Sequence, residues 1–526
     1  MIIDRHPARR APGPLRWACL ALLGVAHLAA AASAPETRLA VARLHATAPS
    51  GAMLWLGHGN RAQRALDLLR DAPAHGLDAA AYGVDELAQR LARQETGAAF
   101  DTDLSAAMLQ YLSDLHDGRT VPDYPALPPA PAHADPVALL LEALASDQLD
   151  AAVQAAEPAI PLYHRVKTSL AHYRALAGQA AQWTALPPPA AGASVAPGAP
   201  YAGTPLLRER LRLLGDLDAA NGGPESAADS LYTPALATAV RHFQARHGLA
   251  PDGKLGVATR AALAVPPERR VRQLELTLER LRWLAPLPRG RQVVVNLPTY
   301  RLIAFDNAHP GAEQPLEMRV IVGTAARTPT PLFIGQLRYL EFNPYWNVPP
   351  SIQAGEILPA FARNPGYLAQ HDMELVSDKG QALPGSHAAQ LAALRAGALR
   401  IRQRPGPRNV LGAVKFAMPN PMNIYLHSTS AQGLFGQSRR DLSHGCIRVE
   451  QPAELAQFVL ADPLHWNAAS VAAAMQPGPT RTVPLAQPVP VVLFYATALT
   501  DRAGQVHFAD DIYGRDEKLL RALRGR

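Results

Sequence analysis

The chain has 526 residues, more than one domain usually holds, and 48% of them are hydrophobic, so we expect several folded domains with real cores. Its formal net charge is +7, and nearly half of this charge falls in the first 34 residues. Such mild basicity, without clusters of Lys and Arg interleaved with aromatic residues, argues against a nucleic-acid partner and suits a location near an anionic polymer.

Residues 1–34 have the layout of a secretory signal peptide. Four arginines accompany an apolar run from Trp17 to about Ala32, which ends in small residues. Retention of this run as a membrane anchor is the alternative, because the run approaches the ~18 residues of a spanning helix. Its alanine content and His27 favour cleavage, which also removes Cys19. We therefore expect an exported, periplasmic protein without a stable membrane anchor.

Apolar spacing and chain breaks predict the order of the next domains. Residues 36–186 are mostly helical, with leucines recurring at helical spacing. A tract rich in Pro, Ala and Gly over 187–204 predicts a semi-extended linker and a domain boundary. A module of three helices joined by a Gly-containing turn follows over 205–265, and a connecting helix follows over 266–286.

From Gln292 the apolar pattern changes from helical spacing to alternation, which predicts a β-rich, sandwich-like domain over 290–480. An insertion at about 351–400 has helical character. We expect it to be a cap over a site, with a packed decoration as the alternative. A C-terminal extension covers 484–526. The predicted fold class is therefore a multidomain α+β protein.

Cys446 is the one cysteine outside the signal peptide, and it is a candidate nucleophile. It lies in the segment Ser443-His444-Gly445-Cys446-Ile447-Arg448. Exported proteins usually pair their cysteines, yet this one has no partner in the chain. The alternatives are a buried small hydrophobe, an intermolecular disulfide and a metal site shared with His444. Polar neighbours oppose burial, and further metal ligands at motif spacing are missing, so we expect no metal and no cofactor.

His427 is the predicted general base. Alternation along Asn423–His427 places this histidine on the polar side of a strand. A free thiol has a pKa of roughly 8.5, so an imidazole that accepts its proton makes Cys446 a better nucleophile. The backbone carbonyl of Ser428 is a plausible partner for the other ring nitrogen. His444 is either a residue that shapes the turn or the base itself.

Two residues beside Cys446 have candidate roles of their own. Gly445 lets substrate approach the backbone, and the amides of Gly445 and Cys446 are candidates to stabilise an oxyanion. Arg448 lies two residues beyond Cys446, so in an extended chain both side chains face the same side. This arginine either binds a substrate carboxylate and favours the thiolate, or pairs with Glu450.

The spacing from His427 to Ser443-His444-Gly445-Cys446 resembles the signature of the L,D-transpeptidase catalytic (YkuD-type) domain. Other segments resemble the large periplasmic branch of that family, which carries a helical scaffold, a peptidoglycan-binding module and a capped catalytic domain. The segments that carry this wider resemblance are 343–350, 402–407, 411–412 and 510–516, together with 207–211, 243–249 and 252–259 in the three-helix module.

The resemblance implies that Cys446 attacks the carbonyl on the L-centre of the diamino acid in a tetrapeptide stem, expelling D-alanine and forming a thioester. An amine of a second stem then resolves the thioester into a 3→3 cross-link. We expect Arg448, Tyr425, Trp346 and Asn343 to contact substrate. The implied partners are peptidoglycan stem peptides and glycan, with wall synthases as a further class. The alternatives are an L,D-carboxypeptidase and a non-catalytic peptidoglycan-binding protein.

Overall fold

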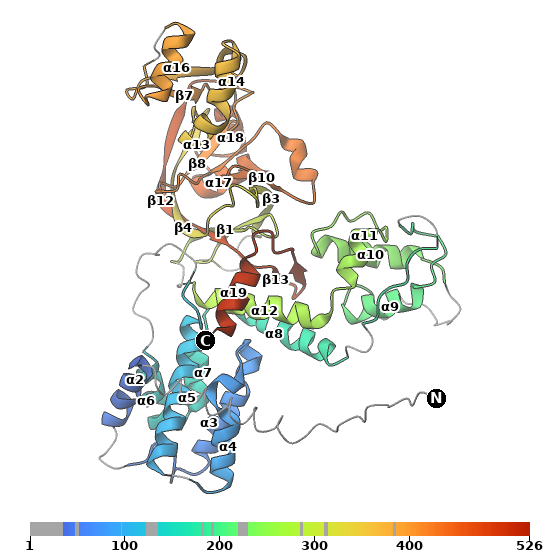
Figure 1. The fold of residues 1–526 in the computed structure, drawn as a ribbon, viewed down its shortest axis with the longest axis vertical. Coiled ribbons are helices and arrows are strands. Elements are labelled where there is room, and N and C mark those ends of the chain that lie inside the picture. Colours follow the sequence, from blue (N-terminus) through green and yellow to red (C-terminus); the bar gives the residue numbers. More distant parts are fainter. Residues whose placement is uncertain are drawn as a thin grey trace, which may run out of the picture.

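The computed structural model describes most of the chain. The described residues are 35–47, 52–95, 97–122, 135–179, 183–190, 194–218, 230–284, 288–309, 314–381 and 385–525. The predicted signal peptide over 1–34 lies outside them. Figure 1 shows a helical N-terminal body in blue, a three-helix module in green to one side, and a β-rich body in yellow to red above both. Within these stretches no helix is both long and apolar enough to cross a membrane.

The N-terminal body is helical, as predicted. Its helices are α2 (Pro35–Ala46), α3 (Arg61–Arg70), α4 (Val84–Ala92), α5 (Ala98–Asp117), α6 (Pro136–Ser146), α7 (Leu149–Ala156) and α8 (Pro161–Ala177), with 3-10 turns at Ala72–His75 and Ala79–Tyr82. The longest helix, α5, packs against α2, α3, α4, α6 and α7. It buries Leu104, Met108 and Leu112 at the helical spacing seen in the sequence. The body therefore has one core centred on α5.

The three-helix module consists of α9 (Thr204–Leu213), α10 (Pro234–Arg246) and α11 (Val257–Leu263). The amide of Gln244 donates to the Asp252 carboxylate and to the Thr259 hydroxyl, which folds the predicted turn against α10. We had expected a semi-extended linker over 187–204. Its second half instead belongs to the three-helix module, because Tyr201 is buried in the core of this module. Burial of that apolar ring holds the second half of the segment on the module.

The β-rich body is built on a closed sheet. Its strands are β1 (Arg291–Asn296), β2 (Arg301–Asp306), β3 (Leu316–Gly323), β4 (Phe333–Phe342), β8 (Val414–Ala417), β9 (Leu426–His427), β11 (Ile447–Val449) and β12 (Arg481–Phe494). They bond in the order β3-β11-β9-β8-β4-β12-β1-β2, and β2 pairs again with β3. This mixed barrel replaces the expected sandwich-like arrangement, because alternation in sequence does not distinguish two stacked sheets from one that closes. A short strand, β10 (Asp441–Ser443), runs parallel to β3.

The barrel extends one strand beyond the predicted boundary at 480. β12 pairs antiparallel with β4 and parallel with β1, so it closes the sheet rather than starting a separate extension. Between β11 and β12, α17 (Pro452–Leu460) and α18 (Ala468–Ala474) pack apolar side chains against the barrel core. The C-terminal extension that remains consists of β13 (Ala498–Thr500), β14 (Val506–Phe508) and α19 (Arg515–Arg524).

We had expected a helical insertion between β4 and β8, but the insertion also contains three strands. Its elements are β5 (Trp346–Asn347), α13 (Pro350–Ile352), a π-helix (Gln353–Ile357), α14 (Leu358–Arg363), α15 (Tyr367–Gln370), β6 (Met373–Val376), α16 (His387–Arg395) and β7 (Arg400–Gln403). The three strands form their own sheet in the order β5-β7-β6. Short strands of two to four residues leave too few alternations to be read from sequence. The insertion lies at the end of the molecule remote from the N-terminal body (Figure 1).

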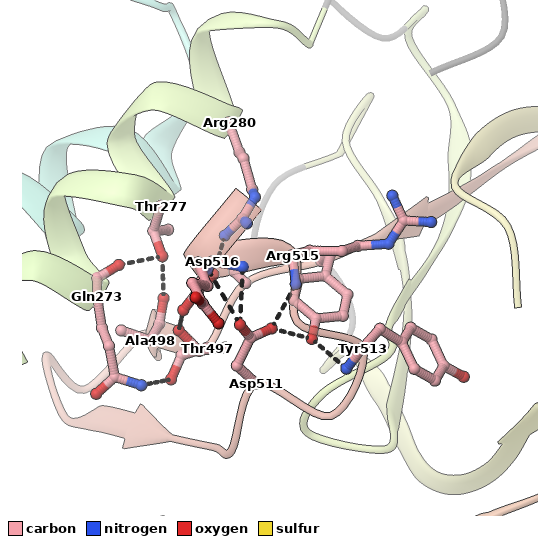
Figure 2. Close-up of polar contacts among 12 residues, drawn as sticks. Gln273, Thr277, Arg280, Thr497, Ala498, Asp511, Tyr513, Arg515 and Asp516 are labelled. Atoms are coloured by element: carbon pink, nitrogen blue, oxygen red, sulfur yellow. Dashed lines mark hydrogen bonds and ion pairs between the residues drawn. The ribbon is translucent and has the colours of Figure 1, made fainter. Parts of the chain in front are cut away.

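Helix α12 (Pro267–Arg282) docks the N-terminal body to the rest of the molecule. On one side, Glu279 accepts a hydrogen bond from the amide of Thr120 at 2.9 Å. On the other, Arg280 pairs with Asp516 of α19 at 2.5 Å (Figure 2). All four residues are buried. The predicted connecting helix is therefore an interface element that joins the N-terminal helices to the C-terminal extension.

Candidate active site

One face of the barrel carries a row of polar side chains across four neighbouring strands. Each member is the register partner of the next: Glu341, Lys415, His427 and Arg448. The residues next to them pair in the same way and are fully buried: Leu340, Phe416, Leu426 and Ile447. Directly paired residues point to the same face of a sheet, so the polar row lies outside the barrel and the apolar row inside.

His427 is held in one orientation on this outer face. Its Nδ1 donates to the backbone carbonyl of Ser428 at 2.6 Å. A carbonyl only accepts, so Nδ1 carries the hydrogen and Nε2 of the neutral ring is the nitrogen that can take a proton. Burial and the positive charge of Arg448 lower the pKa of His427 to about 4. The imidazole is therefore neutral at neutral pH, which is the state that a general base needs.

Ser428, the residue that orients the histidine, is itself fixed. Its hydroxyl donates to the carbonyl of Leu411 at 3.0 Å and accepts from the amide of Val414 at 3.0 Å. The Ser428 side chain is 3% exposed, so water does not compete for these bonds. The carbonyl that meets His427 thus belongs to a segment locked against β8.

Cys446 lies one residue before β11, beside Tyr425 rather than beside His427. Among the described residues its thiol donates to the carbonyl of Asn423, with 3.5 Å between Sγ and oxygen, and not to the imidazole. Burial raises the pKa of Cys446, and hydrogen bonds from the main chain and hydroxyl of Tyr425 oppose that rise. The register explains this placement. His427 pairs with Arg448, and Cys446 lies two residues before Arg448 on the same face, so it is not directly opposite His427. Catalytic hydrogen bonds are often long without substrate.

We had expected the amide of Gly445 to face the site, but it is turned to a neighbouring side chain. Its N–H donates to the hydroxyl of Ser443 at 3.2 Å, and that hydroxyl donates to the carbonyl of Cys446 at 2.6 Å. The backbone of Gly445 has φ of +115°, a conformation that side chains rarely allow. Glycine therefore serves the shape of the turn here, and of the two amides that we considered for an oxyanion, the Cys446 amide is the remaining candidate.

His444 turns toward the insertion. Its Nε2 lies 2.8 Å from a carboxylate oxygen of Glu356 in the π-helix, and both side chains are about half exposed. π-Helical turns are uncommon and often occur at functional sites. The placement fits a residue that shapes the turn, which is one of the two roles considered above. It also brings the insertion into direct contact with the segment that carries Cys446.

Arg448 is a partly buried cation on the same face as His427. The alternative pairing with Glu450 does not occur, because Glu450 accepts from Arg319, with Nε 2.9 Å from the carboxylate. Within the described part of the chain, the buried Nε of Arg448 has no hydrogen-bond partner. Burial lowers the pKa of Arg448, although a guanidinium stays charged at neutral pH. A desolvated cation without a counter-ion favours an anionic ligand.

Two residues that we expected to contact substrate, Tyr425 and Trp346, lie where the barrel packs against the insertion. Burial raises the pKa of Tyr425, and the negative charge on an ionised Cys446 adds to that rise. The Tyr425 ring also lies under Lys415, with 5.0 Å from Nζ to the ring centroid. Trp346 is buried in the core of the insertion, against which Tyr425 packs. Tyr425 therefore lies beside Cys446, whereas Trp346 belongs to the core of the insertion.

Asn343 does not contribute its side chain to the site, contrary to our expectation. Its Nδ2 donates to the carbonyls of Ala474 and Gln476, at 3.2 and 2.8 Å, and so anchors the end of α18. The residue has a left-handed φ of +49° at the end of β4. A short amide that satisfies local backbone groups is typical of such positions. Asn343 is therefore structural.

The structure adds two residues that sequence reasoning missed. Glu356 contacts His444 from the insertion, and Lys415 is the register partner of His427. Lys415 also pairs with Glu341 at 2.7 Å. Alternation along β8 was a usable signal for Lys415, because Val414 and Phe416 flank it, whereas nothing in the sequence marked Glu356. Across the described residues, no cluster of three or more His, Cys, Asp or Glu is arranged to hold a metal ion.

Comparison with known proteins agrees with the resemblance seen in the sequence. Residues 290–491 match the model of the L,D-transpeptidase catalytic domain, 47–170 match a scaffold domain, and 203–263 match a domain described as "Putative peptidoglycan binding domain". A "Putative L,D-transpeptidase" of Haemophilus influenzae is 31% identical over 247 residues, which are 47% of this chain and 48% of that protein. The chain thus matches about half the length of this curated relative. Residues 290–491 form an L,D-transpeptidase catalytic domain, joined in one chain to a scaffold domain and a peptidoglycan-binding domain.

Proposed function

We propose that this protein forms 3→3 cross-links in peptidoglycan through a thioester on Cys446. The observation that carries the proposal is the register of β9 and β11. It sets His427 beside Arg448 and Tyr425 beside Cys446 on one outer face of the barrel. On that face, the candidate nucleophile, base and anion site lie on two neighbouring strands or immediately before one of them.

In the first half-reaction, Sγ of Cys446 attacks the carbonyl on the L-centre of the diamino acid. The thiol leaves the carbonyl of Asn423 as substrate binds, and its proton passes to Nε2 of His427. The new S–C bond forms, the C–N bond to D-alanine breaks, and His427 returns the proton to the departing amine. Because the cysteine pKa is raised and the histidine pKa is lowered, the resting pair is neutral, and proton transfer accompanies attack.

In the second half-reaction, the side-chain amine of another stem attacks the thioester. The S–C bond breaks, a new amide C–N bond forms, and the amine proton returns to the sulfur by way of His427. One peptide bond has then been exchanged for another, so no external energy source is needed. A covering insertion that restricts water favours the amine over hydrolysis.

Other parts of the chain fit the same substrate. Arg448, a cation whose buried Nε lacks a partner among the described residues, suits the free carboxylates of stem peptides. The peptidoglycan-binding domain would hold the enzyme on glycan. The arginines and apolar run of residues 1–34 support export to the periplasm, where this polymer is found.

The test is incubation of the purified protein with disaccharide-tetrapeptide, followed by mass spectrometry of the products. We expect cross-linked dimers and released D-alanine, and none with Cys446→Ala at unchanged melting temperature and sacculus binding. His427→Ala should slow formation of the thioester far more than His444→Ala does. The reverse order would exchange the roles of the two histidines.

The same experiment separates the alternative functions. Tripeptide monomers without dimers would replace the proposal with an L,D-carboxypeptidase. Neither product, with binding to sacculi intact, would indicate a non-catalytic wall-binding protein. Cross-linking that persists in Cys446→Ala would overturn the nucleophile assignment.

A further inference from the structure

The segment 510–516 has no role in the chemistry proposed above, although it is one of the segments that carry the wider resemblance. It connects β14 to the first turn of α19 and packs against the barrel core through the side chain of Tyr513. The Tyr513 ring stacks on Tyr495, with 5.9 Å between centroids. Figure 2 shows the ring of Tyr513 pointing away from the cluster around Asp511 and Asp516. Its hydroxyl is therefore available to another part of the molecule.

That hydroxyl closes the base of the loop that follows β3. It donates to the carbonyl of Gly323 at 2.6 Å and accepts from the amide of Thr330 at 3.3 Å. The amide of Gly323 in turn donates to the hydroxyl of Thr330 at 2.8 Å. Two hydroxyl groups thus tie together the two ends of the loop from Gly323 to Thr330.

The same loop end holds the turn that carries the nucleophile. The Thr330 hydroxyl donates to the carbonyl of Gly445 at 2.7 Å, immediately before Cys446. The backbones also touch, because a Cβ placed on Gly323 would lie 3.0 Å from the Cα of Gly445 and 2.0 Å from the carbonyl oxygen of Thr328. Only glycine fits at residue 323. A shift of this loop end would therefore move the backbone beside Cys446.

Tyr513 is itself mounted on a rigid support. Its amide donates to the hydroxyl of Tyr495 at 3.0 Å, and that hydroxyl donates to Asp511 at 2.5 Å (Figure 2). The Asp511 carboxylate also accepts from the amides of Arg515 and Asp516 in the first turn of α19, at 2.8 and 3.0 Å. An acidic group at a helix N-terminus satisfies amides that the helix leaves unpaired.

We propose that Tyr513 is a positioning residue for Cys446. Its hydroxyl fixes the loop from Gly323 to Thr330, and Thr330 fixes the carbonyl of Gly445. Removal of the hydroxyl leaves a carbonyl and an amide without their partner, so the loop end relaxes toward other donors and acceptors. A nucleophile displaced by a fraction of an ångström loses much of its rate without losing substrate affinity. The catalytic part of this proposal rests on the proposed function, whereas the positioning part does not.

The test compares Tyr513→Phe with Thr277→Val in the full chain. Thr277 donates to the carbonyl of Ala498 at 2.9 Å in the α12 interface, so its variant also loses one buried hydrogen bond of the C-terminal region. We expect Tyr513→Phe to lower kcat for cross-linking roughly ten-fold with KM changed less than about two-fold. We also expect a changed rate of iodoacetamide alkylation at Cys446, read by peptide mass spectrometry from pH 6 to pH 10. Thr277→Val should alter neither.

Thr330 supplies a second pair of variants. Thr330→Ser keeps the bridging hydroxyl and should retain kcat, whereas Thr330→Val removes it and should behave like Tyr513→Phe. The alkylation profile does not depend on substrate, so it reports positioning even if the wild type makes no cross-links. Wild-type kcat and alkylation in Tyr513→Phe would overturn the proposal, as would equal changes in Thr277→Val.

Discussion

Buried charge is used differently at the α12 interface and at the catalytic face. In the interface, Arg282 donates to Glu279 at 3.2 Å and to the hydroxyl of Tyr163 at 3.1 Å. Glu279 in turn accepts from the amide of Thr120. On the catalytic face, Arg448 is desolvated, yet its Nε lacks a partner among the described residues. Arg282 thus has an acidic partner within the protein, although its Nε also lacks a hydrogen-bond partner among the described residues, whereas Arg448 forms no ion pair within them.

The contrast follows from the cost of burying charge. An ion pair removed from water repays its desolvation only when its geometry is good and further hydrogen bonds support it. The Glu279 carboxylate has such support, because it accepts from Arg282 and from the amide of Thr120. An unpaired cation lowers stability by itself, and such residues persist where function requires them. The two regions therefore predict opposite responses to the same kind of substitution.

The largest effect should come from breaking the interface. Arg282→Met leaves Glu279 buried without its cation and should lower the free energy of unfolding by about 3–5 kcal/mol, measured by urea denaturation. Arg64→Met is the matched control, because Arg64 and Asp150 form a half-exposed pair and should contribute less than about 1 kcal/mol. Equal losses in the two variants would contradict the distinction between a buried and a surface ion pair.

The same substitution in the site should affect binding rather than folding. Arg448→Met should raise KM for the stem peptide roughly 50-fold, about 2.3 kcal/mol, because the carboxylate loses its cation. The free energy of unfolding should change by less than about 1 kcal/mol or increase, since an unpaired charge has been removed. Arg319→Met, which breaks the pair with Glu450 on the neighbouring strand, should leave KM unchanged. Destabilisation like that of Arg282→Met would show that Arg448 is structural.

His427 should make the catalytic barrel sensitive to acid. Its pKa is about 4 in the folded protein, below the ordinary value of 6.5, so the unfolded chain binds the proton first as pH falls. Stability should therefore decrease between pH 6.5 and 4, by about 2 kcal/mol from pH 7 to pH 4.5. His427→Gln should remove this part of the pH dependence in urea denaturation. His465→Gln, at an exposed histidine, should not, and an unchanged slope in His427→Gln would contradict the neutral buried ring.

The smallest effect should come from the contact between the insertion and the nucleophile turn. Glu356→Gln removes the charge opposite His444, and because both groups are half exposed, kcat/KM should fall only about three-fold at low salt. A double-mutant cycle with His444→Gln isolates the pair. Additive effects of the two substitutions would show that the contact does not couple the insertion to the turn.

The helical parts and the alternation of the strands were readable from sequence because their periods are local. Leu104, Met108 and Leu112 are buried in α5 at the predicted spacing. Alternation also placed Leu426 and His427 on opposite faces of β9, as observed. The hydrogen bond from His427 to Ser428 joins neighbours in the chain, so it too was within reach of local reasoning.

The errors fall where distant segments decide. Asn343 was expected at the site, but it serves carbonyls more than 130 residues away at the end of α18. The hydrogen bond from the Gly445 amide to the Ser443 hydroxyl is different, because it joins residues two positions apart and was missed although it is local. The insertion contains a sheet whose strands β5, β6 and β7 are too short to show a period. Neither the position of Asn343 nor the sheet of the insertion has a signal in the nearby residues.

Local pattern was enough to predict the helix period of α5, the opposite faces of Leu426 and His427, and the hydrogen bond from His427 to Ser428. Period and motif spacing are properties of neighbouring residues, so one chain suffices to read them. Closure of the barrel, the register that sets His427 opposite Arg448, and the contact of Tyr513 with the loop after β3 depend on pairing between remote segments. Those pairings are selected by packing of the whole core, so they became visible only in the folded molecule.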